Sequence, residues 1–219
     1  MTHVNLTIDG KIVRAKAGEK ILWAALDAGI YIPHLCAIRE ANPPLASCRL
    51  CFVEIQGYPS PVTSCSETVK EGMVVRTRTP RVDRLVRNAF ELILSVHRLD
   101  CKDCPANRNC ELQDMAKRLK VKLKQKRHRK TEPDLPVDES RSDFGLDPNH
   151  CILCGKCIWV CNELIQCGVL DFARRGLATV VSTFDSKPLA EQADCTGCLK
   201  CVEACPAGGL YLKDAKNNE

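Results

Sequence analysis

The sequence predicts a small α+β protein made of three consecutive modules, each built around its own metal-binding cysteines. Its 219 residues include 16 cysteines and few aromatic residues, so a large apolar core is not evident. Domains with a small core need disulfides or metal to be stable. The apolar residues follow strand-like and then helix-like patterns, and the cysteines fall into four separate sets.

The compartment decides between disulfides and metal. The first residues lack the basic and then apolar layout of a secretory signal, and no apolar run reaches membrane-spanning length. Cytosolic thiols stay reduced, which favours metal ligation. We therefore expect a cytoplasmic, metal-binding protein without membrane insertion.

The positive charge is concentrated in one tract, residues 117–130, which holds nine Lys or Arg and no acidic residue. The formal net charge is +5, so the rest of the chain is net acidic. The chain is therefore not a globally basic nucleic-acid binder. The tract lacks interleaved aromatic residues and is expected to be solvated or to dock against an acidic partner. A zinc-stabilised nucleic-acid-binding protein is the remote alternative.

The N-terminal segment has the pattern of a small sheet with one helix. Apolar and polar residues alternate over residues 4–8, and Asp9–Gly10 favours the tight turn of a hairpin. Residues 18–28 predict a helix, and residues 52–55 and 73–77 predict further short strands. This order around a cysteine loop is typical of a β-grasp domain.

The first cysteine set combines one short C-x2-C pair with two distant cysteines. Plant-type [2Fe–2S] proteins use such a pair with a remote fourth ligand, although the first gap is longer here. A zinc site would favour two short knuckles, and only one is present. The set predicts one [2Fe–2S] cluster in a domain of residues 1–79, on Cys36, Cys48, Cys51 and Cys65.

The second set follows a helical apolar pattern over residues 81–96. It consists of His97, Cys101, Cys104 and Cys110. Three cysteines can hold three corners of a [4Fe–4S] cubane, with His97 on the fourth iron. A histidine favoured at a helix C-terminus and a Cys3His zinc site fit the same spacing. Spacing alone leaves these interpretations open for this module, residues 80–130.

The third and fourth sets repeat the bacterial two-cluster run C-x2-C-x2-C-x3-C, and the second copy is followed by Pro206. In that arrangement the fourth cysteine of each run binds the other cluster. Residues 131–219 therefore predict a domain with two [4Fe–4S] clusters. Cys167 is left over, and it is expected to be a small buried residue, with a reactive or alternative ligand role as the other interpretation. One cluster is expected on Cys151, Cys154, Cys157 and Cys205, and the other on Cys161, Cys195, Cys198 and Cys201.

Four stretches carry a family resemblance: residues 47–54 (Ser-Cys-Arg-Leu-Cys-Phe-Val-Glu), 71–75 (Glu-Gly-Met-Val-Val), 109–114 (Asn-Cys-Glu-Leu-Gln-Asp) and 151–154 (Cys-Ile-Leu-Cys). In this order they resemble the N-terminal iron–sulfur region of the large peripheral subunit of respiratory complex I. They are most similar to the small diaphorase (HoxU-type) iron–sulfur subunit of NAD-linked [NiFe] hydrogenases.

The resemblance implies that His97, with its three cysteines, binds a [4Fe–4S] cluster. It also implies a plant-type ferredoxin-like domain, a helical His/Cys3 module and a bacterial ferredoxin-like domain, in that order. Asn162, where simple bacterial ferredoxins have Pro, and the basic tract depart from the pattern.

By resemblance, the chain is a non-catalytic electron-transfer subunit with four clusters. It would link an FMN-containing, NAD(P)H-oxidising flavoprotein to a hydrogenase. An NAD-linked formate dehydrogenase or an electron-bifurcating complex is the alternative assembly. No glycine-rich dinucleotide loop is present in the sequence, so flavin and nicotinamide are expected on the partner.

Overall fold

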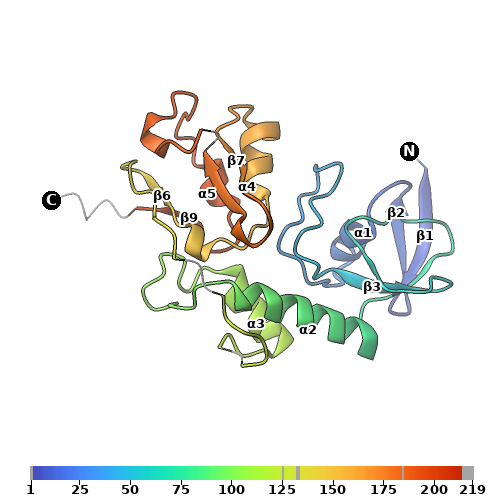
Figure 1. Cartoon of the computed structure of the whole chain (residues 1–219). Helices are drawn as coiled ribbons and strands as arrows, with labels where there is room; N and C mark the ends of the chain where they lie inside the picture. Colours follow the sequence, from blue (N-terminus) through green and yellow to red (C-terminus); the bar gives the residue numbers. More distant parts are fainter. Residues whose placement is uncertain (1, 125, 132–133, 184, 214–219) are drawn as a thin grey trace. The chain divides into compact units, whose positions relative to one another are not determined.

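The computed structural model describes residues 2–124, 126–131, 134–183 and 185–213 (Figure 1). Its contacts divide the chain into two compact units, Met1–Glu91 and Leu92–Glu219. We call them the first unit and the second unit. Both combine short strands with helices, so the predicted α+β class is confirmed. In the described part of the chain, no helix has the length and apolar character needed to cross a membrane.

The first unit is a five-stranded sheet with one helix beside it. The strand order is β2-β1-β5-β3-β4, in which β1 runs parallel to β5 and antiparallel to β2. This mixed sheet is the predicted β-grasp arrangement. Its elements are β1 His3–Ile8, β2 Lys11–Lys16, α1 Ile21–Asp27, β3 Phe52–Ile55, β4 Val62–Thr63 and β5 Val74–Arg76.

The Asp9–Gly10 turn forms as predicted, because both residues have positive φ angles, 49° and 80°. The helix is shorter than expected and begins only after Lys20. Gly18 has φ +85°, a left-handed conformation that cannot belong to the helix. Buried side chains of α1, such as Leu22, pack with Ile8 and other strand residues to form the core.

Helix α2, Pro80–Ser95, agrees closely with the predicted residues 81–96. Its buried face is a ridge of four residues spaced four apart: Val82, Val86, Phe90 and Leu94. Leu92, which the apolar pattern placed on that face, is 53% exposed. Glu91 and Ser95, next to the last two residues of this ridge, are buried as well, whereas the expectation that Leu92 belongs to the buried face is wrong.

The second unit contains short elements joined by cysteine-bearing loops. Helix α3, Glu111–Leu119, ends where Lys120 adopts a left-handed conformation. Two small antiparallel sheets pair β6 with β9 and β7 with β8. The elements are β6 Phe144–Leu146, α4 Lys156–Trp159, β7 Leu170–Ala173, β8 Val180–Thr183, α5 Lys200–Glu203 and β9 Leu210–Leu212, with a π-helical turn at Val160–Leu164 after α4.

Candidate metal centres

Four cysteines of the first unit converge from loops beside β3 and β4. All four are buried, and the Sγ atoms of Cys36 and Cys48 are 3.4 Å apart. The backbone N–H of Cys48 also points to Cys36 Sγ at 3.5 Å. A contact with the partner thiol lowers the pKa of Cys36 and of Cys65, the latter through Cys51. The same contacts raise the pKa of Cys48 and of Cys51, so the four thiols are stable together as thiolates only beside a cation.

His97 lies just beyond the end of α2, and its side chain is buried. Its Nδ1 atom has no hydrogen-bond partner among the described residues. Burial lowers the pKa of His97 to about 4, and the charge of His150 adds to the effect. The imidazole is therefore neutral near pH 7, which is the form that coordinates metal. An orphaned nitrogen in a buried ring fits a metal ligand better than a helix-capping cation.

The three cysteines after His97 are half-buried and lie close enough to influence one another. Burial raises the pKa of Cys104 to about 11, and the neighbouring charges of Cys110 and Cys101 raise it further. Cys110 stands at the N-terminus of α3. Clustered thiols that resist joint ionisation need a cation to hold them as thiolates. The group therefore fits a metal cluster.

His150 is a residue that the sequence analysis missed. It is buried, with Nδ1 at 2.5 Å from Asp147 Oδ2 and Nε2 at 2.6 Å from Asp100 Oδ1. Its ring packs edge-on against His97, with ring centroids 5.7 Å apart. Hydrogen bonding to Asp147 raises the pKa of His150, and Asp100 adds to this. Only its position directly before Cys151 could have indicated it from the sequence.

The two repeated cysteine runs surround two separate cavities in the second unit. One cavity is lined by the first three cysteines of the first run and by Cys205 from the second run. The other is lined by the first three cysteines of the second run and by Cys161 from the first run. The full sets are Cys151, Cys154, Cys157 and Cys205 in the first cavity, and Cys161, Cys195, Cys198 and Cys201 in the second. Each run therefore contributes its last cysteine to the cavity of the other.

Burial raises the pKa of Cys151, Cys154 and Cys157 in the first cavity, and the charges of the other members of the same set add to it. Cys205 has this effect on Cys151 and Cys154, whose pKa values rise to about 12. Cys161 acts in the same way on Cys201 in the second cavity. Such sets are stable as thiolates only around a cation-rich core. Among the described residues, no three metal-binding side chains converge tightly enough for a single metal ion.

Backbone N–H groups point at several of these sulfurs. Leu153 N lies 3.3 Å from Cys151 Sγ, and Leu170 N lies 3.4 Å from Cys161 Sγ. Leu210 N lies 3.4 Å from Cys205 Sγ in the same way. Hydrogen bonds of this kind stabilise thiolate ligands and tune the potential of a bound cluster.

Two glycines in the loops of these runs have backbone conformations that favour glycine. Gly155 and Gly197 have φ angles of +78° and +68°. A Cβ atom at Gly197 would also lie 2.7 Å from Nη2 of Arg141, whose guanidinium is held by Asp143 at 2.8 and 2.9 Å. A side chain at position 197 would therefore displace the cation beside the second cavity.

Cys167 does not lie apart from the candidate centres, as a simple packing residue would. Its Sγ atom is 3.2 Å from Cys161 Sγ, and it lines the second cavity. Burial and the contact with Cys161 raise its pKa. Its spacing of six residues after Cys161 matches no ligand pattern, so the sequence carried no signal for this contact.

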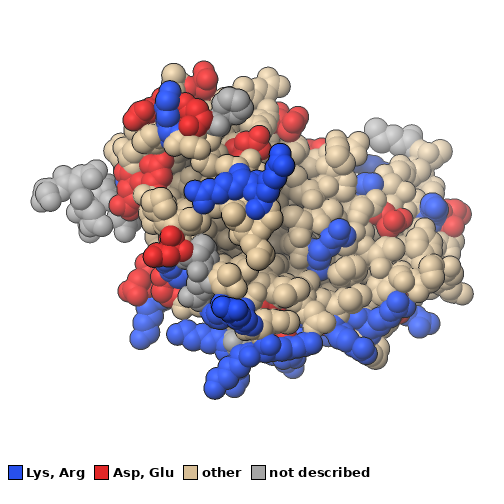
Figure 2. All heavy atoms as spheres, viewed as in Figure 1, with Lys and Arg blue, Asp and Glu red and all other residues tan. Residues whose placement is uncertain are grey.

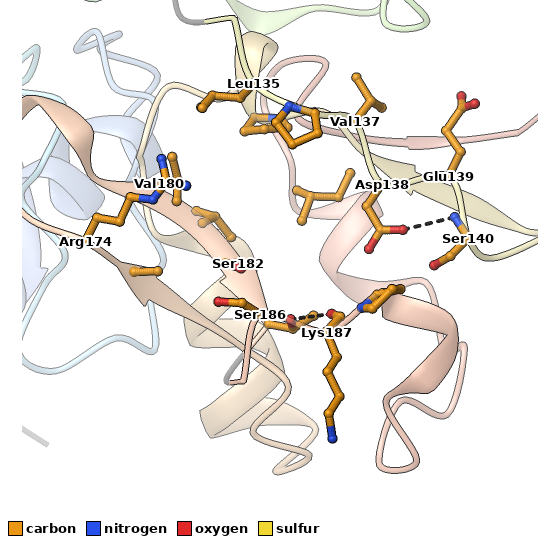
Figure 3. A pocket seen from close by; sticks show the side chains of 17 residues that line it. Leu135, Val137, Asp138, Glu139, Ser140, Arg174, Val180, Ser182, Ser186 and Lys187 are labelled. Carbon is orange, nitrogen blue, oxygen red and sulfur yellow. Dashed lines mark hydrogen bonds between the residues drawn. The ribbon is translucent and has the colours of Figure 1, made fainter.

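A larger hollow, of about 520 Å³, lies among residues 135–140, β8 and residues 186–188 (Figure 3). Asp138 closes one side, since its carboxylate accepts hydrogen bonds from the backbone of Ser140 at 3.0 Å and of Leu189 at 2.8 Å. None of the described residues around it is a cysteine or histidine. It therefore lies outside the candidate metal centres.

The basic tract is exposed but anchored. Val121 is buried, whereas Lys120 and Lys122 on either side are exposed. At the far end of the tract, the backbone N–H of Thr131 donates to the carbonyl of Ser95 at 2.9 Å. Figure 2 shows Lys and Arg side chains gathered along the edge where Figure 1 places α3. The tract is therefore tied to the second unit at Val121 and, just beyond its end, at Thr131.

Three family models match consecutive parts of the chain. Residues 1–80 match a 2Fe-2S iron–sulfur cluster binding domain, and residues 87–124 match the NADH-ubiquinone oxidoreductase-G iron–sulfur binding region. Residues 143–206 match a 4Fe-4S dicluster domain. The expected types and order of the modules are confirmed by these matches, and the expected number of clusters is consistent with them.

Curated relatives match nearly the whole chain. The alpha subunit of the NADPH-Fe(3+) oxidoreductase of Geobacter sulfurreducens is 39% identical over 97% of this chain and 24% of its own length. The NADP-reducing hydrogenase subunit HndD of Solidesulfovibrio fructosivorans is 36% identical over 96% of this chain and 36% of its own. The chain thus spans about a quarter to a third of the length of these relatives.

A solved structure covers almost the same length. A chain in the crystal structure of an NAD+-reducing [NiFe]-hydrogenase in the H2-reduced state has a TM-score of 0.85 and 29% sequence identity. The match covers 99% of this chain and 90% of that chain. The resemblance inferred from the sequence is confirmed.

Proposed function

This chain belongs to the family of iron–sulfur proteins that includes the large peripheral subunit of complex I and its hydrogenase counterparts, and from that premise we propose that it is an electron-transfer subunit with four clusters. It passes electrons singly between an FMN-containing, NAD(P)H-oxidising flavoprotein and a hydrogenase. It has no substrate site of its own, and it works in the cytoplasm.

We propose four ligand sets for these clusters. The [2Fe–2S] cluster is held in the first unit, and the three [4Fe–4S] clusters are held in the second. The sets are Cys36, Cys48, Cys51 and Cys65; His97, Cys101, Cys104 and Cys110; Cys151, Cys154, Cys157 and Cys205; and Cys161, Cys195, Cys198 and Cys201.

The observation that carries the proposal is the crossing of the two cysteine runs. Cys161 and Cys205 exchange places between the two cavities, which is the ligand pattern of bacterial two-cluster domains. A zinc knuckle needs no such exchange, because its ligands come from two nearby pairs. The crossing therefore favours paired cubanes over structural zinc.

The bound clusters would supply reversible one-electron chemistry. The protein buries or half-buries all of the proposed cysteine ligands except Cys198 and directs backbone N–H groups at some of their sulfurs. Apolar residues such as Leu146 and Val181 line the first cavity and exclude water from it. His97 contributes a neutral ligand in place of a thiolate. A less anionic ligand set raises the reduction potential, so this site is expected to be easier to reduce than an all-cysteine equivalent.

The hydrogenase assembly is preferred for two reasons. The solved structure that matches in fold comes from an NAD+-reducing [NiFe]-hydrogenase, and one relative is called a NADP-reducing hydrogenase subunit. Another relative is called an NADPH-Fe(3+) oxidoreductase subunit, so the same module serves other terminal enzymes. A formate dehydrogenase or an electron-bifurcating complex remains the alternative assembly.

Iron and acid-labile sulfide analysis of anaerobically purified protein tests the cluster content. The proposal expects about fourteen irons per chain and four reducible paramagnetic centres by EPR. Cys51→Ala should remove about two irons with the [2Fe–2S] signal, whereas Cys104→Ala should remove about four with one cubane signal. Colourless protein that contains zinc and no iron would overturn the proposal.

Native mass spectrometry of the complex purified from cells tests the partners. A flavoprotein and a nickel-containing hydrogenase are expected to accompany the chain. A pterin enzyme without any nickel protein would reject the hydrogenase assembly in favour of the formate dehydrogenase alternative, while leaving the electron-transfer role intact.

The exposed basic tract supports a docking role against an acidic surface of a partner protein. Charge reversal of Lys120, Lys122 and Lys124 should weaken complex assembly at low salt and have less effect at moderate salt. Reversal of Lys11 and Lys70, which are exposed in the first unit, is the matched control. Unchanged assembly of the tract variant at low salt would refute this role.

A further inference from the structure

The second cavity is lined by five cysteine thiols, although a [4Fe–4S] cluster needs four. The additional thiol is that of Cys167. The first cavity, by contrast, is lined by four cysteines only. The two halves of the repeat are therefore unequal at the position where each run supplies its last ligand.

Cys167 is held against Cys161 by the backbone as well as by the side-chain contact. Its Sγ is 3.2 Å from Cys161 Sγ and 3.6 Å from the Cys161 carbonyl oxygen. Its own N–H donates to that carbonyl at 3.0 Å. The flanking residues Gln166 and Gly168 have φ angles of +61° and +65°. A left-handed Gln is unfavourable, so the fold maintains this turn against a local preference.

The equivalent region of the first cavity provides an internal comparison. Leu170 N approaches Cys161 Sγ at 3.4 Å, and Leu210 N approaches Cys205 Sγ at the same distance. The neighbour of Cys205 Sγ is the carbonyl oxygen of Ala207, at 3.2 Å, where Cys161 has the thiol of Cys167. The two cysteines thus have similar surroundings except for the fifth thiol.

We propose that Cys167 is a reserve ligand that can replace Cys161 at the cluster of the second cavity. The inference rests on the proposed function, because it requires a [4Fe–4S] cluster there. In the exchange, the bond between iron and Cys161 breaks and a bond between iron and Cys167 forms. One proton passes from the Cys167 thiol to the Cys161 thiolate, and no electron is gained or lost. The two sulfurs are already in contact, so the proton has a direct path.

The exchange of ligands would protect the cluster of the second cavity, which is the more exposed of the two cavities. In the second cavity Cys161 is buried, Cys195 and Cys201 are half-buried and Cys198 is exposed, whereas the first cavity has two buried and two half-buried cysteines and none that is exposed. Solvent reaches iron–thiolate bonds more easily at an exposed site, where oxidation of a ligand is also faster. A fifth thiol retains the cluster when one ligand is lost.

Alanine variants of the two crossed ligands test the proposal, with Cys205→Ala as the matched control. Cys161→Ala should keep about fourteen irons and all cubane EPR signals, one of them shifted, because Cys167 takes over. Cys205→Ala has no reserve thiol and should lose about four irons. The double variant Cys161→Ala/Cys167→Ala should lose about four as well, and Cys167→Ala alone should lose none.

Loss of the same cluster in Cys161→Ala as in Cys205→Ala would overturn the reserve role, as would retention in the double variant. If Cys161→Ala fails to fold, the isosteric Cys161→Ser is compared with Cys161→Ser/Cys167→Ala, and identical EPR spectra would refute the proposal. Failure of the proposed function is distinguishable, because wild-type protein would then lack the full iron content.

Discussion

Replacing Gly208 by Ala should selectively disrupt the His97 centre. A Cβ atom at this position would lie 2.7 Å from Cys104 Sγ and 3.3 Å from His150 Cβ, whereas ordinary contacts are 3.4–4 Å. The backbone of Gly208 is not left-handed, so Ala adds no backbone strain there. The destabilisation comes from the steric clash of the added Cβ atom alone. Overpacking of this kind typically costs about 1–3 kcal/mol.

To restore an ordinary contact of 3.4 Å from 2.7 Å, the sulfur of Cys104 would have to move by about 0.7 Å, whereas metal–ligand distances tolerate shifts of only about 0.2 Å. A cost of about 1–3 kcal/mol corresponds to roughly 5- to 150-fold weaker retention of the cluster. The measured iron content should therefore fall from about fourteen to about ten irons per chain. EPR of the reduced protein should lose the signal of the His-ligated cluster and keep that of the [2Fe–2S] cluster.

Gly176→Ala is the matched control. Gly176 has φ +61°, so Ala introduces backbone strain of about 1–2 kcal/mol, but a Cβ there would touch nothing within 4 Å. This variant should keep every cluster. A full set of wild-type signals in Gly208→Ala, or the same loss in both variants, would contradict the close approach of Cys104 as the cause.

Three other perturbations follow from the structure. His97→Cys should retain a cubane whose potential is lower, because a thiolate replaces a neutral imidazole; an EPR redox titration that finds an unchanged or higher potential would argue against His97 as a ligand. Leu22→Ala, at a fully buried position of α1, should destabilise the first unit by about 2–5 kcal/mol in urea unfolding and leave the cubane signals intact; equal loss of all clusters would be inconsistent with two separate units. Anaerobic iron removal with a chelator should abolish hydrogen-exchange protection in the second unit and preserve it in the first. The core of the second unit includes Cys157, Cys161 and several other thiols, whereas that of the first is mainly aliphatic. Retained hydrogen-exchange protection in the second unit would show that its apolar contacts are sufficient to keep it folded without the clusters.

Local chemistry explains which features could be predicted from the sequence. The Asp9–Gly10 turn, helix α2 and the glycine bends at positions 155 and 197 depend on backbone preferences within a few residues. The start of α1 after Lys20 was missed, because Gly18 is compatible with a helical pattern until its left-handed conformation is known. Apolar periodicity likewise could not separate exposed Leu92 from its buried neighbours.

The modules and the grouping of cysteines could be predicted from residue spacing, because ligand spacing within a loop restricts which metal the loop can hold. Contacts between side chains far apart in the chain became evident only from the folded structure. Asp100 is hydrogen-bonded to His150, which lies 50 residues further along the chain. Gly208 packs closely against Cys104, and the turn after Cys161 places Cys167 in the lining of the second cavity. These contacts depend on how whole segments pack, and no pattern of neighbouring residues encodes that packing.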